Sequence, residues 1–260
     1  MCFSIKGLLY DQFSNDVTDL LRELDKKYSM TESTENARKK MQEPRFKTWD
    51  DDLKSAGMLI NLYTNSDEYK HLPNATFYRS LNEAIRSENP DFIWQNSEKL
   101  LNEALHRIGL ETFNYTFRGQ KHYNPDDHQE REPFNVRGFW STTLHPSHTD
   151  HFGGTEYAFY IIKNVEGVNV QHVSVTDMEK EVLLQSSKKY ILERKISNKE
   201  EQRKKLESIQ LQYPDFDPSK FDPENIFILN ENRKHDEVSL NENRKHDEVP
   251  LKENREHVEL

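Results

Sequence analysis

The chain has 260 residues, of which 33% are hydrophobic and 32% are charged, and its formal net charge is −10. This length allows one large or two small domains, but the composition is too polar for one compact domain, so we expect part of the chain to be solvated. The acidic balance argues against a general nucleic-acid binder. No stretch approaches the ~20 apolar residues of a membrane span.

The first region, residues 1–48, is predicted to hold one short helix and a polar linker. Val17, Leu20, Leu21 and Leu24 recur at helical spacing, and TESTENARKKMQEP, which follows, reads as the linker. The N-terminal residues have too short an apolar core for a signal peptide. Cys2 is the only cysteine, so no disulfide can form within the chain. We therefore expect an intracellular, cytoplasmic protein.

The second region, residues 49–198, is predicted to be the main domain. Its pattern is helical from Trp49 to about Gly109, where the glycine is a natural stop. After Gly109 the period changes to alternation in FNYTFR, and FWSTTL, EYAFYIIKNV, VNVQHVSV, EVLLQ and KYILE follow as further short strands. Helices followed by strands favour an α+β fold.

The C-terminal part is predicted to lie outside this domain, with the ordered core ending near Ser197. Residues 199–228 combine a polar helix with a Pro-rich segment. Residues 229–260 repeat with a period of eleven, as LNENRKHDEVS, LNENRKHDEVP and LKENREHVEL. Each repeat offers too few apolar residues to bury a seam, which predicts a solvated tail that could bind a partner.

Three short stretches carry residues suited to chemistry. Arg118 ends an alternating strand, where a guanidinium can fork onto a phosphate, and Gly119 lets a ligand approach the backbone. Ser141 begins a run of three hydroxyls, Ser-Thr-Thr, after two aromatic residues. In DMEKEVLL, residues two apart in a strand would share a face roughly 6.5–7 Å apart, so Glu179 and Glu181 would point the same way. Taken singly, each stretch is more typical of an ordinary surface strand.

Read in order, these stretches resemble the arginine–serine–glutamate signature of mono-ADP-ribosyltransferases, in particular the arginine-specific branch. The resemblance covers about residues 49–196, and this chain has Ser-Thr-Thr where Ser-Thr-Ser is usual. It implies an N-terminal helical part followed by two small, mainly antiparallel sheets that form an NAD cleft. It also implies NAD as the substrate, no metal, and an arginine-bearing target protein as the acceptor.

The resemblance assigns a role to each candidate residue. Glu181 would stabilise the cationic sugar and accept a hydrogen bond from a ribose hydroxyl, and Ser141 would orient Glu181. Arg118 would hold the pyrophosphate, and the backbone of Gly119 would meet the nicotinamide amide. Glu179 would bind the acceptor guanidinium and take its proton.

Phe152, followed by the flexible pair Gly153 and Gly154, would stack on nicotinamide. His145, His148 and His151 lie in the same loop, but three histidines in a Gly-rich loop have no fixed geometry for a metal.

Two other functions remain open at the level of sequence. The same residues would serve an NAD glycohydrolase that uses water as acceptor. The chain could also be a catalytically silent NAD-binding or interaction module, although such a module has no physical reason to keep two crowded carboxylates.

Overall fold

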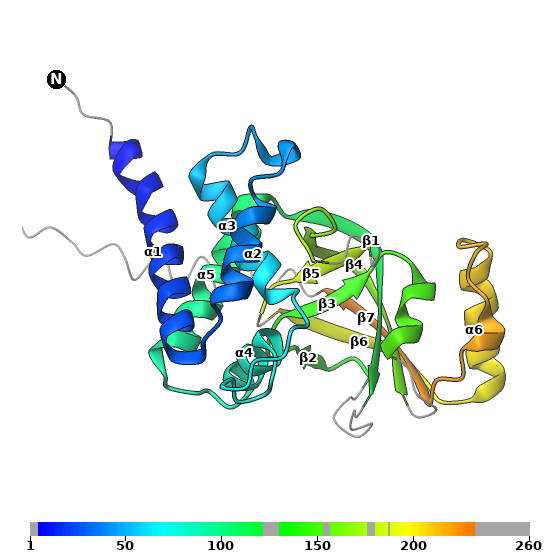
Figure 1. Ribbon diagram of the computed structural model, residues 1–260. Coiled ribbons are helices and arrows are strands. Elements are labelled where there is room, and N and C mark those ends of the chain that lie inside the picture. Colours follow the sequence, from blue (N-terminus) through cyan, green and yellow to red (C-terminus); the bar gives the residue numbers. More distant parts are fainter. Residues whose placement is uncertain (1–4, 122–129, 153–156, 176–179, 187, 232–260) are drawn as a thin grey trace, which may run out of the picture.

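The computed structural model describes residues 5–121, 130–152, 157–175, 180–186 and 188–231 (Figure 1). Its α-helices are α1 (Ile5–Tyr28), α2 (Thr31–Lys40), α3 (Asp51–Tyr63), α4 (Phe77–Arg86), α5 (Phe92–Ile108) and α6 (Lys199–Gln210). Its strands are β1 (Glu111–Lys121), β2 (Pro133–Asn135), β3 (Trp140–Thr143), β4 (Tyr157–Asn169), β5 (Glu181–Leu184), β6 (Lys189–Ile196) and β7 (Asn225–Glu231). Short 3-10 helices are η1 (Pro44–Phe46), η3 (Pro146–Phe152) and η4 (Pro218–Lys220). The predicted α+β order, with helices first and mainly antiparallel strands after, is confirmed.

Side-chain caps fix where the central helices begin. Asp50, Thr76 and Asp91 each accept a hydrogen bond from a backbone N–H in the first turn of α3, α4 and α5, respectively. At the other end of α5, Gly109 adopts a φ of 112°, a conformation that favours glycine. The predicted glycine stop is therefore confirmed.

The N-terminal region packs into the same hydrophobic core as the helices that follow it. Val17, Leu20, Leu21 and Leu24 of α1 are at most 4% exposed and belong to one cluster with side chains of α3 and α5. The predicted apolar stripe is confirmed.

The predicted polar linker is wrong, because its first ten residues form α2. Glu, Ala, Arg and Lys have high helix propensity, and Ala37 is buried. Ser33 is also buried and bonded to Tyr69 and Asn65. A polar sequence can thus form a packed helix when small side chains line its inner face.

Hydrogen bonds join the seven described strands in the order β1-β3-β5-β4-β7-β6-β2, with a further pairing between β1 and β4. The long strand β4 pairs along its length with β1 and β7 and near its end with β5. The strands that we expected to form two small sheets are therefore hydrogen-bonded to one another in one order, with β1 and β4 also paired directly. Among the described pairings, only β4 with β7 is parallel.

β7 corrects the prediction that the ordered core ends near Ser197. It lies between β4 and β6, with Ile226 and Ile228 packed in the hydrophobic cluster on one face and Phe227 and Leu229 in the cluster on the other. The sequence signal, a run of four apolar residues, is short and merges with the first eleven-residue repeat. Repeat residues 229–231 are thus part of this strand, and residues 232–260 lie outside the described residues.

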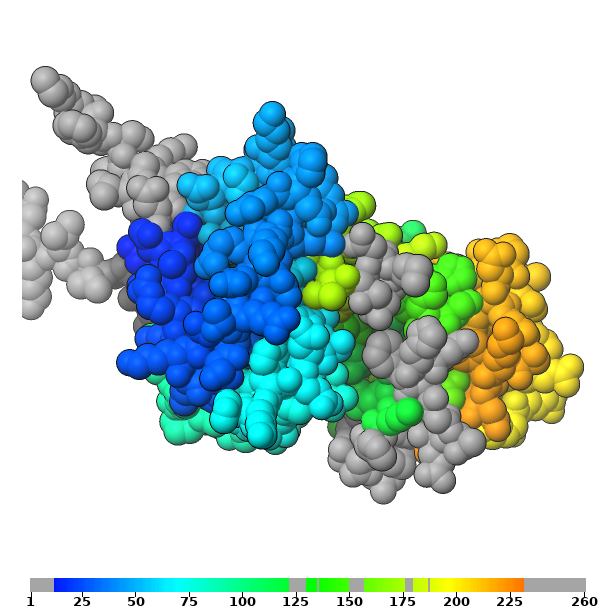
Figure 2. Space-filling model, viewed as in Figure 1, coloured from blue at the N-terminus to red at the C-terminus, as the bar shows by residue number. Residues whose placement is uncertain are grey.

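The helices cover the strands from two sides. In Figure 1, α1 to α5 gather on one side of the strands and α6 lies on the other. Leu206 and Ile209 of α6 pack into the cluster that includes Ile226. Figure 2 shows the N-terminal helices, in blue and cyan, and the α6 region, in yellow and orange, at opposite ends of this face. Among the described residues, no helix is long and apolar enough to cross a membrane.

Candidate functional site

Strand β1 presents Arg118 to β3 and β4. Arg118 pairs with Tyr160 of β4, and its guanidinium lies over the ring of Trp140, 5.4 Å from the centroid. Its Nη1 donates a hydrogen bond to the carbonyl oxygen of Ser141 at 2.6 Å. Its Nε is buried and has no hydrogen-bond partner in the described part of the chain. The guanidinium is therefore oriented by β3 but still has hydrogen-bonding capacity.

Glu181 opens β5 and is buried, at 6% exposure. Desolvation lowers the pKa of Arg118, while electrostatic interactions with Tyr63, Tyr160 and Glu181 raise it. The strand register agrees with this, because Phe117, next to Arg118 in β1, pairs with Thr143 of β3, and Thr143 pairs with Glu181. These two residues and Ser141 come from three different strands.

The register of β3 and β5 places Thr143, rather than Ser141, directly opposite Glu181. Ser141 is opposite Leu183 and is a diagonal neighbour of Glu181 on the same face. Directly opposed side chains in an antiparallel pair lie closest. Thr143 is therefore a second candidate, beside Ser141, for the residue that orients Glu181. In the sequence, Thr143 is only the third hydroxyl of the Ser-Thr-Thr run.

Two helices hold the start of β3 in place. Tyr63 of α3 donates a hydrogen bond to the carbonyl oxygen of Phe139 (3.3 Å) and accepts one from Nδ2 of Asn82 (2.9 Å). Asn82 of α4 accepts a hydrogen bond at Oδ1 from the backbone N–H of Phe139 (2.8 Å). Phe139 comes two residues before Ser141, so this pair positions the serine strand. Sequence reasoning missed both residues, because Tyr63 and Asn82 fall in stretches that show only helical periodicity.

Burial raises the pKa of Tyr63 well above its ordinary value, and the charge of Glu181 raises it further. Tyr63 is therefore a neutral hydrogen-bond donor at physiological pH. A second tyrosine, Tyr78, lies 6.3 Å from Tyr63 between ring centroids. The Arg118 end of the site is thus lined by aromatic side chains from both helices and strands.

The structure describes only some of the remaining residues that were predicted for the site. Gly119 lies in β1, opposite Phe159. Phe152 ends η3, but its side chain lies outside the described residues, as do Gly153, Gly154 and Glu179. β5 begins at Glu181, and Lys180 before it has a φ of 46°, so the extended alternation inferred for DMEKEVLL stops at Glu181. The predicted placement of Glu179 relative to Glu181 lies outside the described residues.

Two histidines follow β3, with His145 just before η3 and His148 within it. The rings of His145 and His148 are 5.6 Å apart, and His145 meets the ring of Tyr213 edge-on. Within the described ranges, no group of three or more His, Cys, Asp or Glu residues could hold a metal ion. The side chain of His151 is outside those ranges.

Comparison with known families places this geometry in context. A model of the family described as NAD:arginine ADP-ribosyltransferase matches residues 10–215. This span includes α2 and α1 from Tyr10 onward, which lie outside the region that the sequence motifs cover. No curated protein matches the chain.

Solved structures with a similar fold include bacterial and eukaryotic proteins. Exoenzyme S from Pseudomonas aeruginosa is 17% identical, with a TM-score of 0.55 over 84% of this chain and 90% of its own. The eukaryotic mono-ADP-ribosyltransferase ART2.2 is 20% identical, with a TM-score of 0.54 over 72% and 82%. HopU1 of Pseudomonas syringae pv. tomato is 14% identical, with a TM-score of 0.51 over 83% and 87%. At these identities the likeness shows a shared fold.

Proposed function

Because the chain belongs to the NAD:arginine ADP-ribosyltransferase family, we propose that it transfers ADP-ribose from NAD to arginine side chains of a target protein. The observation that carries this proposal is that adjacent paired strands hold Arg118, Ser141 and Glu181, with Arg118 bonded to the Ser141 carbonyl oxygen. Exoenzyme S was solved with carba-NAD and a form of ART2.2 with NADH. These dinucleotide complexes support NAD as the donor here.

Arg118 is suited to hold the pyrophosphate. It is the half-buried cation whose Nε has no partner among the described residues, and Trp140 and the Ser141 carbonyl fix its plane. A planar guanidinium can donate two hydrogen bonds to one phosphate group. Gly119, next in the strand, lets the ligand approach the backbone, and Phe152 is proposed to stack on nicotinamide.

Glu181 is proposed to stabilise the reacting sugar. As the bond between C1′ of the ribose and the nicotinamide nitrogen breaks, nicotinamide leaves as a neutral molecule and the ribose becomes an oxocarbenium-like cation. A buried carboxylate beside that carbon lowers the energy of this state, because little water screens the interaction. Ser141 and Thr143 on the neighbouring strand are suited to hold its orientation.

Glu179 is proposed to supply acceptor specificity. A free guanidinium has a pKa above ~12 and is not a nucleophile, so a base must take its proton as the nitrogen bonds to C1′. A carboxylate that binds the guanidinium and accepts this proton completes the transfer. Replacement of Glu179 by glutamine should therefore suppress transfer to arginine more than hydrolysis of NAD.

The test is incubation of the protein with labelled NAD and a small guanidine acceptor. We expect a guanidine adduct with the wild-type protein and at least about 100-fold less with Glu181→Gln, which removes the stabilising charge. The matched control, Glu23→Gln, changes an exposed glutamate of α1 and should leave the rate unchanged. Free ADP-ribose without adduct would instead identify a glycohydrolase. Equal labelling by wild type and Glu181→Gln, or labelling by neither, would contradict the assignment.

A further inference from the structure

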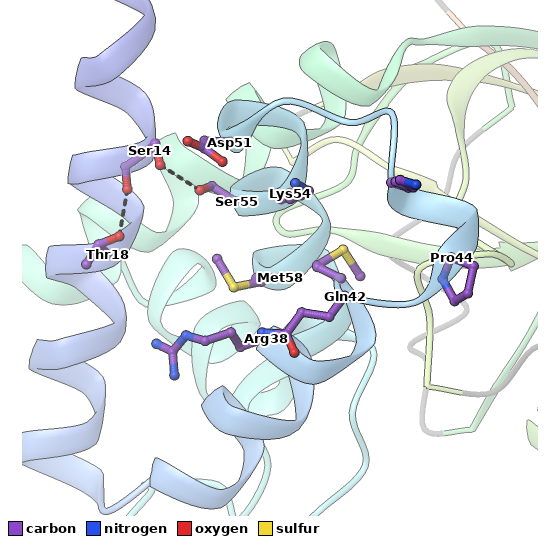
Figure 3. A pocket seen from close by; sticks show the side chains of 11 residues that line it. Ser14, Thr18, Arg38, Gln42, Pro44, Asp51, Lys54, Ser55 and Met58 are labelled. Atoms are coloured by element: carbon purple, nitrogen blue, oxygen red, sulfur yellow. Dashed lines mark hydrogen bonds between the residues drawn. The ribbon is translucent and has the colours of Figure 1, made fainter.

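A pocket of about 750 Å³ lies in the helical part, between α1, α2 and α3 (Figure 3). A hydrogen bond of 2.9 Å between the hydroxyls of Ser14 and Ser55 joins α1 to α3 at its edge. None of the proposed catalytic residues that the structure describes lines this pocket. A cavity of this size is in the usual range of ligand sites.

The lining includes two methionines. Met41 is buried, at 2% exposure, and Met58 is half-buried. Gly57 makes room for the first, because a Cβ at that position would overlap Sδ of Met41. In Figure 3, Met58 lies between Ser55 and Arg38. Thioether side chains are flexible and polarisable, which suits a surface that receives an apolar group.

Three cations surround the methionines, and none has a partner among the described residues. Arg38 and Lys47 are exposed and Lys54 is half-buried, and within the described ranges no ion pair or hydrogen bond involves their charged ends. By contrast, Arg45, close by in the chain, pairs with Glu43 at 2.8 Å. Asp51 is the only carboxylate among the described residues of the lining. The pocket is therefore locally positive in a chain with a net charge of −10.

This arrangement differs from that of a compact phosphate site. The three cations come from α2, from the segment after η1 and from α3, and two of them are exposed, so they surround the pocket instead of converging on one point. An apolar floor with a charged, solvated rim is the anatomy of a protein-binding surface. The complementary partner is a peptide segment with an apolar side chain flanked by carboxylates.

We infer that this pocket binds an acidic, partly apolar segment of the target protein. The inference rests on the proposed function, because the partner is the protein that carries the acceptor arginine. An apolar side chain of that segment packs against the half-buried Met58, and its carboxylates pair with Arg38, Lys47 and Lys54. Docking at a site separate from the catalytic residues lowers the KM for the protein acceptor without changing the chemical step.

The binding experiment uses a dye-labelled peptide of alternating glutamate and leucine and follows its fluorescence anisotropy. The test variant is the triple substitution Arg38→Gln, Lys47→Gln and Lys54→Gln. The matched control, Lys26→Gln, Lys39→Gln and Lys70→Gln, neutralises three exposed lysines that do not line the pocket. We expect the Kd to rise about tenfold in the test variant, since each exposed ion pair contributes a few-fold, and to stay within about twofold in the control.

Further experiments distinguish this inference from other binding modes. A peptide with serine in place of leucine should bind the wild-type protein more weakly, because it leaves Met58 uncovered. Equal Kd values for the two triple variants would overturn the inference. Displacement of the peptide by inorganic phosphate, at concentrations where sulfate of equal ionic strength has no effect, would also overturn it in favour of a phosphate site.

Peptide binding is measured without NAD and on the Glu181→Gln variant, so its outcome does not depend on turnover. Where the wild-type protein is an active transferase, an arginine joined to the acidic peptide should show an about tenfold higher KM with the test variant and an unchanged kcat. The small guanidine acceptor should react equally with both triple variants. An equal loss for both acceptors would contradict a docking role.

Discussion

Two arginines, one in the helical part and one in the strands, show how differently this protein treats a partly buried cation. Arg107 of α5 donates to Asp52 at 2.7 Å and to Glu103 at 2.7 and 3.1 Å, and it lies 4.2 Å from the ring centroid of Phe13. Its charge is matched by two carboxylates, so it joins α1, α3 and α5. Arg107 is therefore part of the stable framework.

Arg118 in β1 has no such pairing. It donates to one backbone carbonyl and lies over one aromatic ring, and its Nε lacks a partner in the described part of the chain. A buried donor without a partner costs free energy, of order 1–3 kcal/mol. The difference teaches that a paired cation stabilises the fold, whereas an unpaired one is available for a ligand at a cost in stability.

Removal of β7 should have the largest effect, because it takes the central support from the strands that hold Arg118. A chain that ends at Glu224 loses the buried Ile226, Phe227 and Leu229, each worth roughly 1.5–3 kcal/mol. This loss approaches the whole stability of a typical domain. We expect no cooperative thermal unfolding and no activity.

The control for this truncation is a chain that ends at Glu231. It keeps the carboxylate of Glu231, which binds Lys188 and the backbone N–H of Glu166. It should melt cooperatively and modify a small guanidine acceptor at the wild-type rate. A folded, active chain ending at Glu224 would show that the sheet does not need β7.

The two arginines should give opposite results when each is changed to methionine. Arg118→Met should raise the KM for NAD by about 100-fold, through loss of a charge-assisted phosphate contact, and leave stability equal or higher. Arg107→Met should cost about 2–3 kcal/mol, because it removes the ion pair between the guanidinium and the buried Asp52, and leave the KM for NAD unchanged. Urea unfolding and steady-state kinetics on both variants measure the two effects. Equal stability losses for both variants would remove the distinction between them.

Gly138→Ala should disturb the link between the helices and β3. Gly138 has a φ of 114°, and a Cβ there would lie 2.6 Å from Oδ1 of Asn82, which binds the N–H of Phe139. We expect a loss of about 2–3 kcal/mol from strain and the disrupted hydrogen bond, with lower activity.

Gly109→Ala is the control for Gly138→Ala, because it introduces backbone strain without a close contact of the added Cβ. Gly109 has a nearly equal φ of 112°, but no atom lies within 4 Å of its added Cβ. It should lose about 1 kcal/mol, from backbone strain alone, and keep full activity. Similar losses of stability and activity in the two variants would mean that the contact with Asn82 does not matter.

The smallest expected effect is a pH dependence of stability that arises from His145. Burial lowers the pKa of His145, and the charges of Lys180 and His148 lower it further, while Asp215 opposes them. The unfolded chain, with a histidine pKa near ~6.5, then binds a proton that the folded chain does not. This contribution to stability is present above that pH and is lost as the pH falls towards the lower folded value.

His145→Asn should therefore reduce the slope of stability against pH in this window, as thermal melts between pH 5 and 8 would measure. His106→Asn, a change on the exposed side of α5, serves as the control for histidine number. An unchanged slope in His145→Asn would assign the pH dependence to other groups.

The sequence by itself determined the local pattern of this protein. Helical spacing in α1 and α5, the glycine stop at Gly109 and the alternation around Arg118 each depend on neighbouring residues, so they can be read from a short window. The order of the arginine, serine and glutamate stretches likewise predicted the family. Polar composition concealed α2 and β7, since Ala37 and the apolar run in β7 are buried by distant partners.

Only the tertiary structure decided which of these elements meet. Residues far apart in the chain meet in three places. Thr143 lies opposite Glu181, Tyr63 and Asn82 form hydrogen bonds with the backbone of Phe139, and Arg107 pairs with Asp52. Periodicity fixes which face of an element is apolar, but pairing depends on the summed contacts of all elements at once. A side chain's role in this protein therefore follows from what the fold places beside it.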